Sequence, residues 1–283
     1  MKNILLTVSY DGTDFCGWQR QDLPPAPAGD GAGGAAGSAA QGGARAEAFR
    51  TVQGELEKAL ERLCKQKVSV YGSGRTDSGV HALAQAANFY SPVESIPAEN
   101  YVRALNAFLP RDVRVTAARE VPEDFSARKN ATSRVYRYFI SFGESVSADT
   151  FRYSWHVKNY EPDLGRLNAL CSCLRGELDC TSFCASGDAS LSMCRYIDDA
   201  HFFMQEDLWG QRLLVFQIEA NAFLWKMVRT LTGTIVSLDK AGATEDALRR
   251  ILDARDRTKA GVTAPPDGLF LYQIKFDGIR RHS

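Results

Sequence analysis

The chain has 283 residues, of which 45% are apolar and 24% are charged, and its 34 basic side chains balance 34 acidic ones. This length suits one large domain or two small ones. No apolar run approaches the roughly 20 residues of a membrane-spanning helix, and the apolar stretch after Met1 ends at Asp11, short of a signal-peptide core. We therefore expect a soluble, cytoplasmic protein with no membrane partner. Neutrality by itself argues against a nucleic-acid partner.

The first part of the chain alternates between the periods of strands and helices. Residues 3–10 form a β-branched and aromatic run that the turn pair Asp11-Gly12 ends, and Thr51 is a plausible N-cap for an amphipathic helix. The remaining elements are strands at 68–71, 85–90 and 113–118 and a helix at 97–108. The predicted order is β-α-β-β-α-β.

One segment, at 24–48, differs in composition from the rest of the chain. Of its 25 residues, 20 are Ala, Gly or Pro, and none has a large apolar side chain. Such a segment buries too little surface to offset the entropy lost on ordering. We expect a flexible surface loop there.

The second part of the chain repeats the order of the first. Its predicted elements are strands at 134–141, 195–204, 212–219 and 269–276, and helices at 163–175, after a cap at Asn221, and from Thr244. Two such parts, 1–125 and 126–283, predict an α+β fold of two fused ferredoxin-like halves. Their sheets are expected to join into one antiparallel or mixed sheet, with an active-site cleft between the halves.

The seven cysteines indicate reduced thiols and no metal site. They form no Cys-x-x-Cys pair, and none of the four histidines lies within the cluster at Cys171, Cys173, Cys180 and Cys184. Structural zinc sites use closely paired cysteines, often together with histidine. We therefore expect no bound metal.

The residues best suited to chemistry lie between the second and third predicted strands. The loop reads Gly72-Ser73-Gly74-Arg75-Thr76-Asp77-Ser78-Gly79-Val80-His81-Ala82. Its glycines permit a tight turn and close approach of a ligand, and a cation near Asp77 would keep the carboxylate ionised as a nucleophile or base. A solvated turn with an incidental ion pair is the alternative. An aspartic protease is disfavoured, because the chain has one Asp-Ser-Gly and Arg75 opposes proton sharing.

This loop resembles the active-site loop of the A-type tRNA pseudouridine synthases. The resemblance continues in order through most of the chain, at 10–13, 17–21, 51–60, 105–110, 125–128, 134–138, 174–176, 181–183, 221–229, 264–265 and 268–271. It implies the pseudouridine synthase fold, a pair of ferredoxin-like halves, which agrees with the predicted elements.

The resemblance also implies roles for five residues. Asp77 matches the catalytic aspartate, and Arg75 matches the basic residue that pairs with the aspartate and helps displace the target base. Tyr136 matches the tyrosine that stacks on the uracil. Arg229 matches the arginine that forms a salt bridge with the aspartate, and Leu269 matches an apolar residue of the uracil pocket. No metal or other cofactor takes part in the implied reaction, and whether Asp77 attacks covalently or removes a sugar proton stays open.

The implied function is isomerisation of uridine to pseudouridine in the anticodon stem-loop of tRNA, at positions 38, 39 or 40. Members of the family act as homodimers that hold tRNA, and we expect the same here. The alternative is a tRNA-binding or tRNA-folding module that has lost catalysis. The intact Asp77, Arg75, Tyr136 and Arg229 argue against that alternative.

The charge of the chain is neutral only on average. Residues 101–140 carry eight basic and four acidic side chains, residues 221–283 carry eleven and seven, and residues 139–220 carry six and twelve. A local surplus of positive charge interleaved with aromatic residues is typical of RNA binding. We therefore predict RNA contacts by a basic set that consists of Arg128, Lys129, Arg134 and Arg137.

Overall fold

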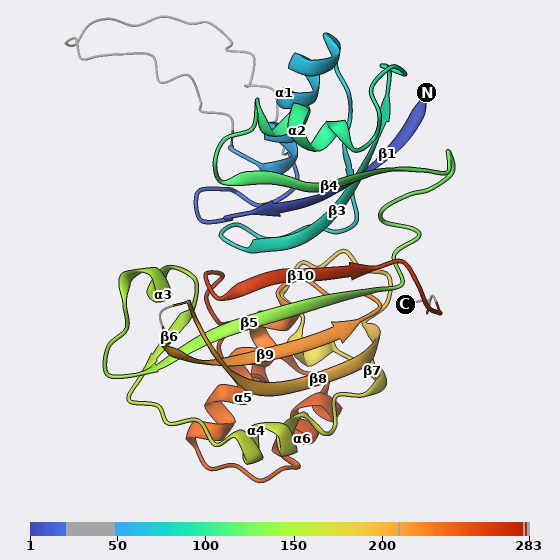
Figure 1. Cartoon of the computed structure of the whole chain (residues 1–283). Helices are drawn as coiled ribbons and strands as arrows, with labels where there is room; N and C mark the ends of the chain where they lie inside the picture. The colour runs from blue at the N-terminus through green and yellow to red at the C-terminus, as the bar shows by residue number, and fades with distance from the viewer. Residues whose placement is uncertain (21–48, 209, 280, 282–283) are drawn as a thin grey trace, which may run out of the picture.

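The computed structural model describes residues 1–20, 49–208, 210–279 and 281 (Figure 1). The loop predicted at 24–48 lies outside these described residues. The elements of the first part are β1 (Lys2–Tyr10), α1 (Val52–Cys64), β2 (Tyr71–Gly72), β3 (His81–Ser91), α2 (Asn100–Asn106) and β4 (Val113–Val121). The later elements are β5 (Ser133–Gly143), α3 (Ala148–Arg152), β6 (Trp155–Lys158), α4 (Leu164–Cys171), β7 (Gly176–Asp179), β8 (Cys194–Glu206), β9 (Arg212–Ala220), α5 (Met227–Lys240), α6 (Ala247–Ala254) and β10 (Leu269–Lys275), with short 3-10 turns at Thr181–Phe183 and Arg257–Lys259.

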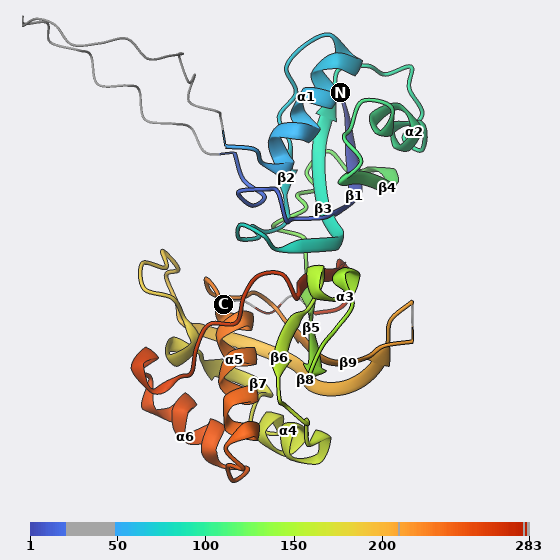
Figure 2. The ribbon, with the colours of Figure 1, turned by 90° about the vertical axis from the view of Figure 1, so that its left-hand side faces the viewer.

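The paired strands form a ten-stranded mixed sheet in the order β4-β1-β3-β10-β5-β9-β8-β7, with β2 paired to β3 and β6 paired to β5. Two of these pairings, β3 with β10 and β5 with β6, are parallel, and the others are antiparallel. In Figure 2, α5 and α6 lie on one side of β8 and β9. This arrangement confirms the predicted α+β class and the predicted joining of the strands into one mixed sheet.

Several predicted elements differ from those observed. The strand predicted at 68–71 shrinks to β2, because the N–H of Val70 bonds to the side chain of Glu57 instead of to a neighbouring strand. The predicted cap at Asn221 is wrong, since its side-chain oxygen accepts from the N–H groups of Tyr196 and Ala222, ahead of α5. The predicted second helix shortens to α2, and α3, β6 and β7 were not predicted.

Apolar side chains gather in two large clusters on either side of the centre of the sheet. One joins α1 and α2 to β1, β3 and β4, with Leu56 and Leu105 fully buried in it. The other joins α4, α5 and α6 to β5, β8 and β9, with Leu231 and Phe216 fully buried. Burial of these side chains supplies the main driving force that holds the helices on the sheet. Among the described residues, no helix is long and apolar enough to cross a membrane.

The two groups of strands meet along a short junction. β3 and β10 pair through only two register positions, His81 with Phe270 and Ala82 with Leu271. Leu271 in turn pairs with Tyr136 of β5. Because His81 is the first residue of β3, the loop that precedes this strand lies at the junction, next to β10 and β5.

Candidate active site

The loop at 73–80 rests on the segment that follows β1. The N–H of Trp18 donates to the carbonyl oxygen of Thr76 at 3.2 Å, and the N–H of Gly79 donates to that of Phe15 at 3.3 Å. The hydroxyl groups of Tyr10 and Thr76 are 2.8 Å apart. Gly17 makes the approach possible, because it has a φ of +103° and a Cβ there would lie 2.6 Å from the Thr76 oxygen. These contacts explain why residues near 10–18 and the loop belong to one site.

Side chains also close the base of the loop. Ser73 donates its hydroxyl to the Oε1 atom of Gln85 at 3.0 Å, and Nε2 of Gln85 donates to the carbonyl oxygen of Gly74 at 3.0 Å. Gln85 is fully buried in β3, so the bond from Ser73 is shielded from water and the bond to Gly74 is partly shielded. These bonds hold the start of the loop that carries Asp77.

The carboxylate of Asp77 meets two donors that come from the other side of the junction. Nη1 of Arg229, in the first turn of α5, lies 3.3 Å from Oδ2, and Nε1 of Trp225 lies 3.0 Å from Oδ1. Arg229 also donates from Nε to the carbonyl oxygen of Ala264 at 2.7 Å. The side chain of Asp77 is 26% exposed and that of Arg229 13% exposed, so the ion pair is only partly screened by water. The pair places a positive charge directly beside the carboxylate of Asp77.

Arg75 lies apart from this ion pair. Its side chain is exposed, and no hydrogen bond or ion pair joins it to another described residue. The cation at Asp77 in this structure is Arg229, not the arginine two residues earlier in the loop. Spacing in the sequence misses this because the contact of Arg229 depends on how α5 meets the loop.

Tyr136 lies on the strand that borders the junction. It lies in β5 opposite Leu271, and its ring meets that of Phe223 edge-on, with 5.0 Å between the centroids. Burial raises the pKa of Tyr136 well above its usual range; the positive charge of Arg134 offsets part of this rise, and the negative charge of Asp77 adds to it. The tyrosine is therefore neutral at physiological pH.

Leu269 lies in the apolar layer below Tyr136. It pairs with Tyr138 across the sheet and is 6% exposed. Side chains at 269 and 271 of β10 face the same side as those at 136 and 138 of β5, because alternate residues of a strand share a face. Leu269 is thus on the same face of the sheet as the tyrosine.

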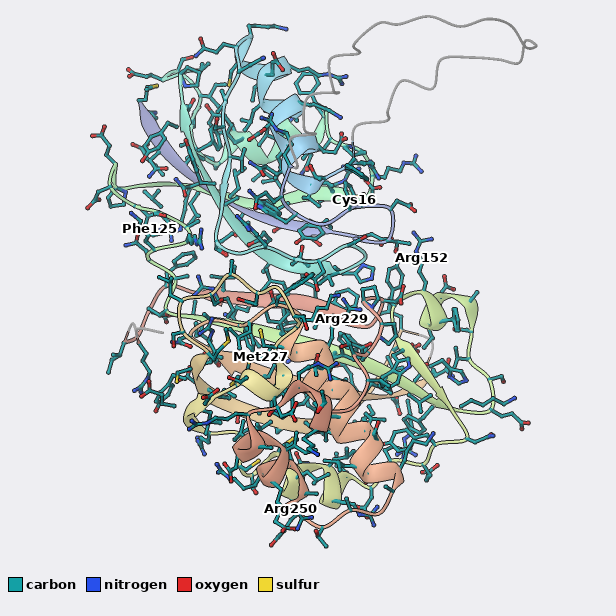
Figure 3. The ribbon with its side chains drawn as sticks, turned by 180° about the vertical axis from the view of Figure 1, so that it is seen from behind. Cys16, Phe125, Arg152, Met227, Arg229 and Arg250 are labelled. Carbon is teal, nitrogen blue, oxygen red and sulfur yellow. The ribbon has the colours of Figure 1, made fainter. Side chains whose placement is uncertain are left out.

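Figure 3 shows Arg229 near the level at which the two groups of strands meet, with Arg250 at the far end of the molecule. In sequence, the family model described as tRNA pseudouridine synthase matches residues 38–128 and 170–277 of the chain. A Treponema denticola protein named tRNA pseudouridine synthase A is 50% identical over 97% of this chain and 93% of its own length. Proteins of that name from Treponema pallidum and Caldicellulosiruptor saccharolyticus are 44% and 37% identical, over 92% and 98% of this chain and 84% and 100% of their own lengths.

The chain belongs to the tRNA pseudouridine synthase family. It is accordingly an isomerase that converts uridine to pseudouridine. The loop that carries Asp77 lies within the first matched range, and Trp225 and Arg229 lie within the second. The match thus covers both sides of the junction at which these residues meet.

The four residues of the basic set predicted to bind RNA lie in different environments. Arg128 and Lys129 are exposed. The guanidinium of Arg134 instead donates to the carbonyl oxygens of Ser73, Arg128 and Asn221. Arg137 lies on the opposite face of β5 from Tyr136, 3.7 Å from the centroid of the Tyr272 ring. The four residues therefore do not share one surface.

Potential metal-ligand side chains do not gather in the described part of the chain. No group of three or more His, Cys, Asp or Glu side chains is placed there to hold a metal ion. All seven cysteines are free. Burial raises the pKa of Cys180 to about 12 and that of Cys184 to about 11, so both thiols stay protonated at neutral pH.

Trp225 and Phe223 are site residues that the reasoning from sequence did not assign. Both lie in the segment 221–229, whose resemblance to the family drew attention to Arg229 alone. Helical spacing gives no signal for Trp225, because it precedes α5 and the left-handed turn at Lys226 separates it from the helix. Only the approach of the Asp77 loop shows that it belongs to the site.

Proposed function

We propose that this chain isomerises uridine to pseudouridine in the anticodon stem-loop of tRNA, at positions 38, 39 or 40, with Asp77 as the catalytic residue. The observation that carries the proposal is the partly buried ion pair of Asp77 with Arg229. The names of the relatives, tRNA pseudouridine synthase A, support tRNA as the substrate.

The reaction needs an ionised carboxylate and no external reagent. The bond between N1 of the uracil and C1′ of the ribose breaks, the base turns, and a bond forms between C5 and C1′. A proton leaves C5 and N1 gains one, so substrate and product are isomers. Asp77 serves as the nucleophile or the base in this sequence, and Arg229 holds its carboxylate through the ion pair.

The target uridine must leave the base stack before its ribose can be reached. Arg75 suits the task of displacing it, because its guanidinium is long, planar and not held by the loop. The neutral ring of Tyr136 offers a stacking face for the uracil, and Leu269 contributes to the apolar wall of the pocket. Arg128 and Lys129, which are exposed, then contact the phosphates, with Arg134 and Arg137 nearby in the chain.

The same proposal includes a homodimer, as the resemblance to the family implies. It also includes a cytoplasmic location, where tRNA is processed, and the division of the chain at 125 into two ferredoxin-like halves. Two large apolar clusters support this division. Light scattering of the purified protein with and without tRNA measures the assembly.

The catalytic assignment is tested with Asp77→Asn on unmodified tRNA transcript that carries uridines at 38, 39 and 40. Pseudouridine is mapped at single-nucleotide resolution, and tRNA affinity is measured in parallel. We expect product with the natural chain and none with the variant, with affinity retained. Asp253→Asn, whose side chain is 65% exposed, is the matched control and should match the natural chain. Product from Asp77→Asn would remove the proposed role, and product at other uridines would remove the proposed positions.

A further inference from the structure

The indole of Trp225 makes a contact with the carboxylate of Asp77 that the family resemblance does not assign. Its Nε1–H donates to Oδ1 at 3.0 Å, while Arg229 approaches Oδ2 at 3.3 Å. Each oxygen of the carboxylate thus has one donor, and the two donors come from residues four apart in the chain. The inference drawn from this contact rests on the proposed catalytic role of Asp77.

Two donors on two oxygens restrict the rotation of a carboxylate about its last side-chain bond. The ion pair alone holds only one of the two oxygens, because Arg229 contacts Oδ2 and not Oδ1. The indole N–H is suited to the second contact, since it donates only, carries no charge and sits on a rigid ring. The two contacts therefore favour one orientation of the Asp77 carboxylate in the protein without substrate, with Trp225 43% exposed at the edge of the site.

The backbone of Trp225 is itself held on both sides. Its N–H donates to Oδ2 of Asp188 at 2.5 Å, and its carbonyl oxygen accepts from the N–H of Ala185 at 3.0 Å. Partial burial of Asp188 is outweighed by hydrogen bonds from Ser190 and from the Trp225 N–H, so the pKa of Asp188 is lowered. Asp188 is therefore a charged acceptor at neutral pH. The segment 185–190 thus anchors the tryptophan.

Lys226 completes the support. It has a φ of 59°, in the left-handed region that a residue with a side chain rarely adopts, and it turns the chain from Trp225 into the start of α5. Its ammonium lies 4.6 Å from the centroid of the indole ring, in cation–π contact. Uncommon backbone geometry of this kind persists only where surrounding contacts require it.

We propose that Trp225 is a positioning residue, whose indole N–H holds the Asp77 carboxylate in the orientation used for reaction. Because the indole acts through Asp77, its removal lowers kcat and leaves the affinity for tRNA unchanged. A residue that only supported the fold would lower the melting temperature instead. One that only gripped RNA would weaken binding.

The kinetic test compares the natural chain with Trp225→Phe and Trp225→His on tRNA transcript under single-turnover conditions. Phenylalanine keeps an aromatic ring and removes the donor, whereas histidine offers an N–H at similar reach. We expect the rate of pseudouridine formation to fall about tenfold in Trp225→Phe and to recover in part in Trp225→His. We expect the affinity of both variants for tRNA to stay within about twofold of the natural value. A twofold change in affinity corresponds to only a small change in the free energy of binding.

A spectroscopic test reads the hydrogen bond directly in the protein without RNA. The indole N–H resonance of Trp225, identified by its absence in Trp225→Phe, is expected downfield and should move upfield in Asp77→Ala, while that of Trp18 stays in place. This measurement keeps the inference testable if Trp225→Phe melts at too low a temperature for kinetics. An indole resonance that is unmoved by Asp77→Ala overturns it.

Three further kinetic outcomes overturn the inference. They are a natural rate in Trp225→Phe, a defect that appears only as weaker tRNA binding, and equal defects in Trp225→Phe and Trp225→His. These are distinct from failure of the proposed function. If Asp77→Asn retains activity, the proposed function fails. If Asp77→Asn is inactive while Trp225→Phe keeps the natural rate, only the role of Trp225 fails.

Discussion

The guanidinium of Arg229 reaches the carboxylate of Asp77 from a position 152 residues later in the chain, with 3.3 Å between Nη1 and Oδ2. The same guanidinium is held from behind by the carbonyl oxygen of Ala264. This double engagement joins three distant segments at one point. Because separate nitrogens of the planar guanidinium make the two contacts, the shape of the arginine side chain is needed as well as its charge.

Replacing Arg229 by lysine should therefore lower kcat although the charge is kept. A single ammonium cannot donate to Asp77 and Ala264 in the same directions, so we expect a fall of about 10-fold to 100-fold, or about 1.4 to 2.7 kcal/mol. Single-turnover kinetics on tRNA transcript measure the change. Arg250→Lys is the matched control, because Arg250 pairs with Asp246 on the exposed surface of α6. A natural rate in Arg229→Lys would contradict the prediction.

Replacing Arg75 by alanine should abolish most of the activity and leave the stability of the fold unchanged. The side chain is exposed and joined to no other described residue, so its removal costs the folded state little. We expect at least a 100-fold lower rate, about 2.7 kcal/mol, and a melting temperature within about 1 °C of the natural value. Arg62→Ala, on the exposed side of α1, serves as the control. A large fall in melting temperature would show that the side chain has a structural role.

Replacing members of the basic set by glutamine should affect tRNA binding at some positions and stability at another. Arg128→Gln combined with Lys129→Gln should weaken tRNA binding and lower the slope of log affinity against log salt by up to about two, one for each phosphate that is no longer neutralised. Arg134→Gln should instead lower the free energy of unfolding by about 1 to 3 kcal/mol, since three carbonyl oxygens lose a charged donor. Binding titrations and urea unfolding measure the two effects. The reverse pattern would count against this division.

Replacing Gly17 by alanine should damage the site through the backbone. The new Cβ would lie 2.6 Å from the Thr76 oxygen and 3.2 Å from the carbonyl carbon of Asp77, at a φ of +103°. The loop must shift to relieve this contact, so we expect a fall in kcat of at least 100-fold and a decrease in stability of about 2 to 4 kcal/mol. Gly242→Ala is an informative comparison, because that glycine also has a positive φ but no atom lies within 4 Å of the added Cβ. Equal falls in activity in both would contradict the argument.

Asp11 makes the fold sensitive to acid. Partial burial alone would raise its pKa, but hydrogen bonds from Thr13, Arg152 and Tyr153 outweigh it and hold the pKa at about 2, below the ordinary 3.8. The ionised group is therefore stabilising above about pH 4, and this stabilisation is lost as the pH falls through 3.8 towards 2. Asp11→Asn should be less stable than the natural chain at pH 7 by about 1 to 2 kcal/mol, after allowance for screening by solvent.

The difference between these two proteins should shrink below pH 4 and vanish only below about pH 2. Urea unfolding at several pH values measures it. Asp253→Asn is the control, and it should be indistinguishable from the natural chain at every pH because Asp253 is largely exposed. A difference for Asp11→Asn that stays constant with pH would contradict the prediction.

Local periodicity predicted the elements with strong patterns and missed those defined by their neighbours. The alternation at 3–10 and the cap at Thr51 correspond to β1 and α1. The short strands β6 and β7 carry too few residues for a period, and they exist because β5 and β8 offer edges for pairing. The cap assigned to Asn221 failed for a similar reason, since its oxygen is taken by Tyr196 from a neighbouring strand.

By itself the sequence determined the class of fold, the resemblance to the family and the loop that carries Asp77, because these depend on residue types in chain order. The resemblance implied that Arg229 forms a salt bridge with Asp77, which the structure contains. Only the tertiary structure decided that Arg75 stands apart from this pair, that Trp225 is the second donor, and that Arg134 holds backbone instead of standing free. These contacts join segments more than 60 residues apart. They follow from the two-position pairing of β3 with β10 and from the packing of α5, which no local pattern of residues encodes.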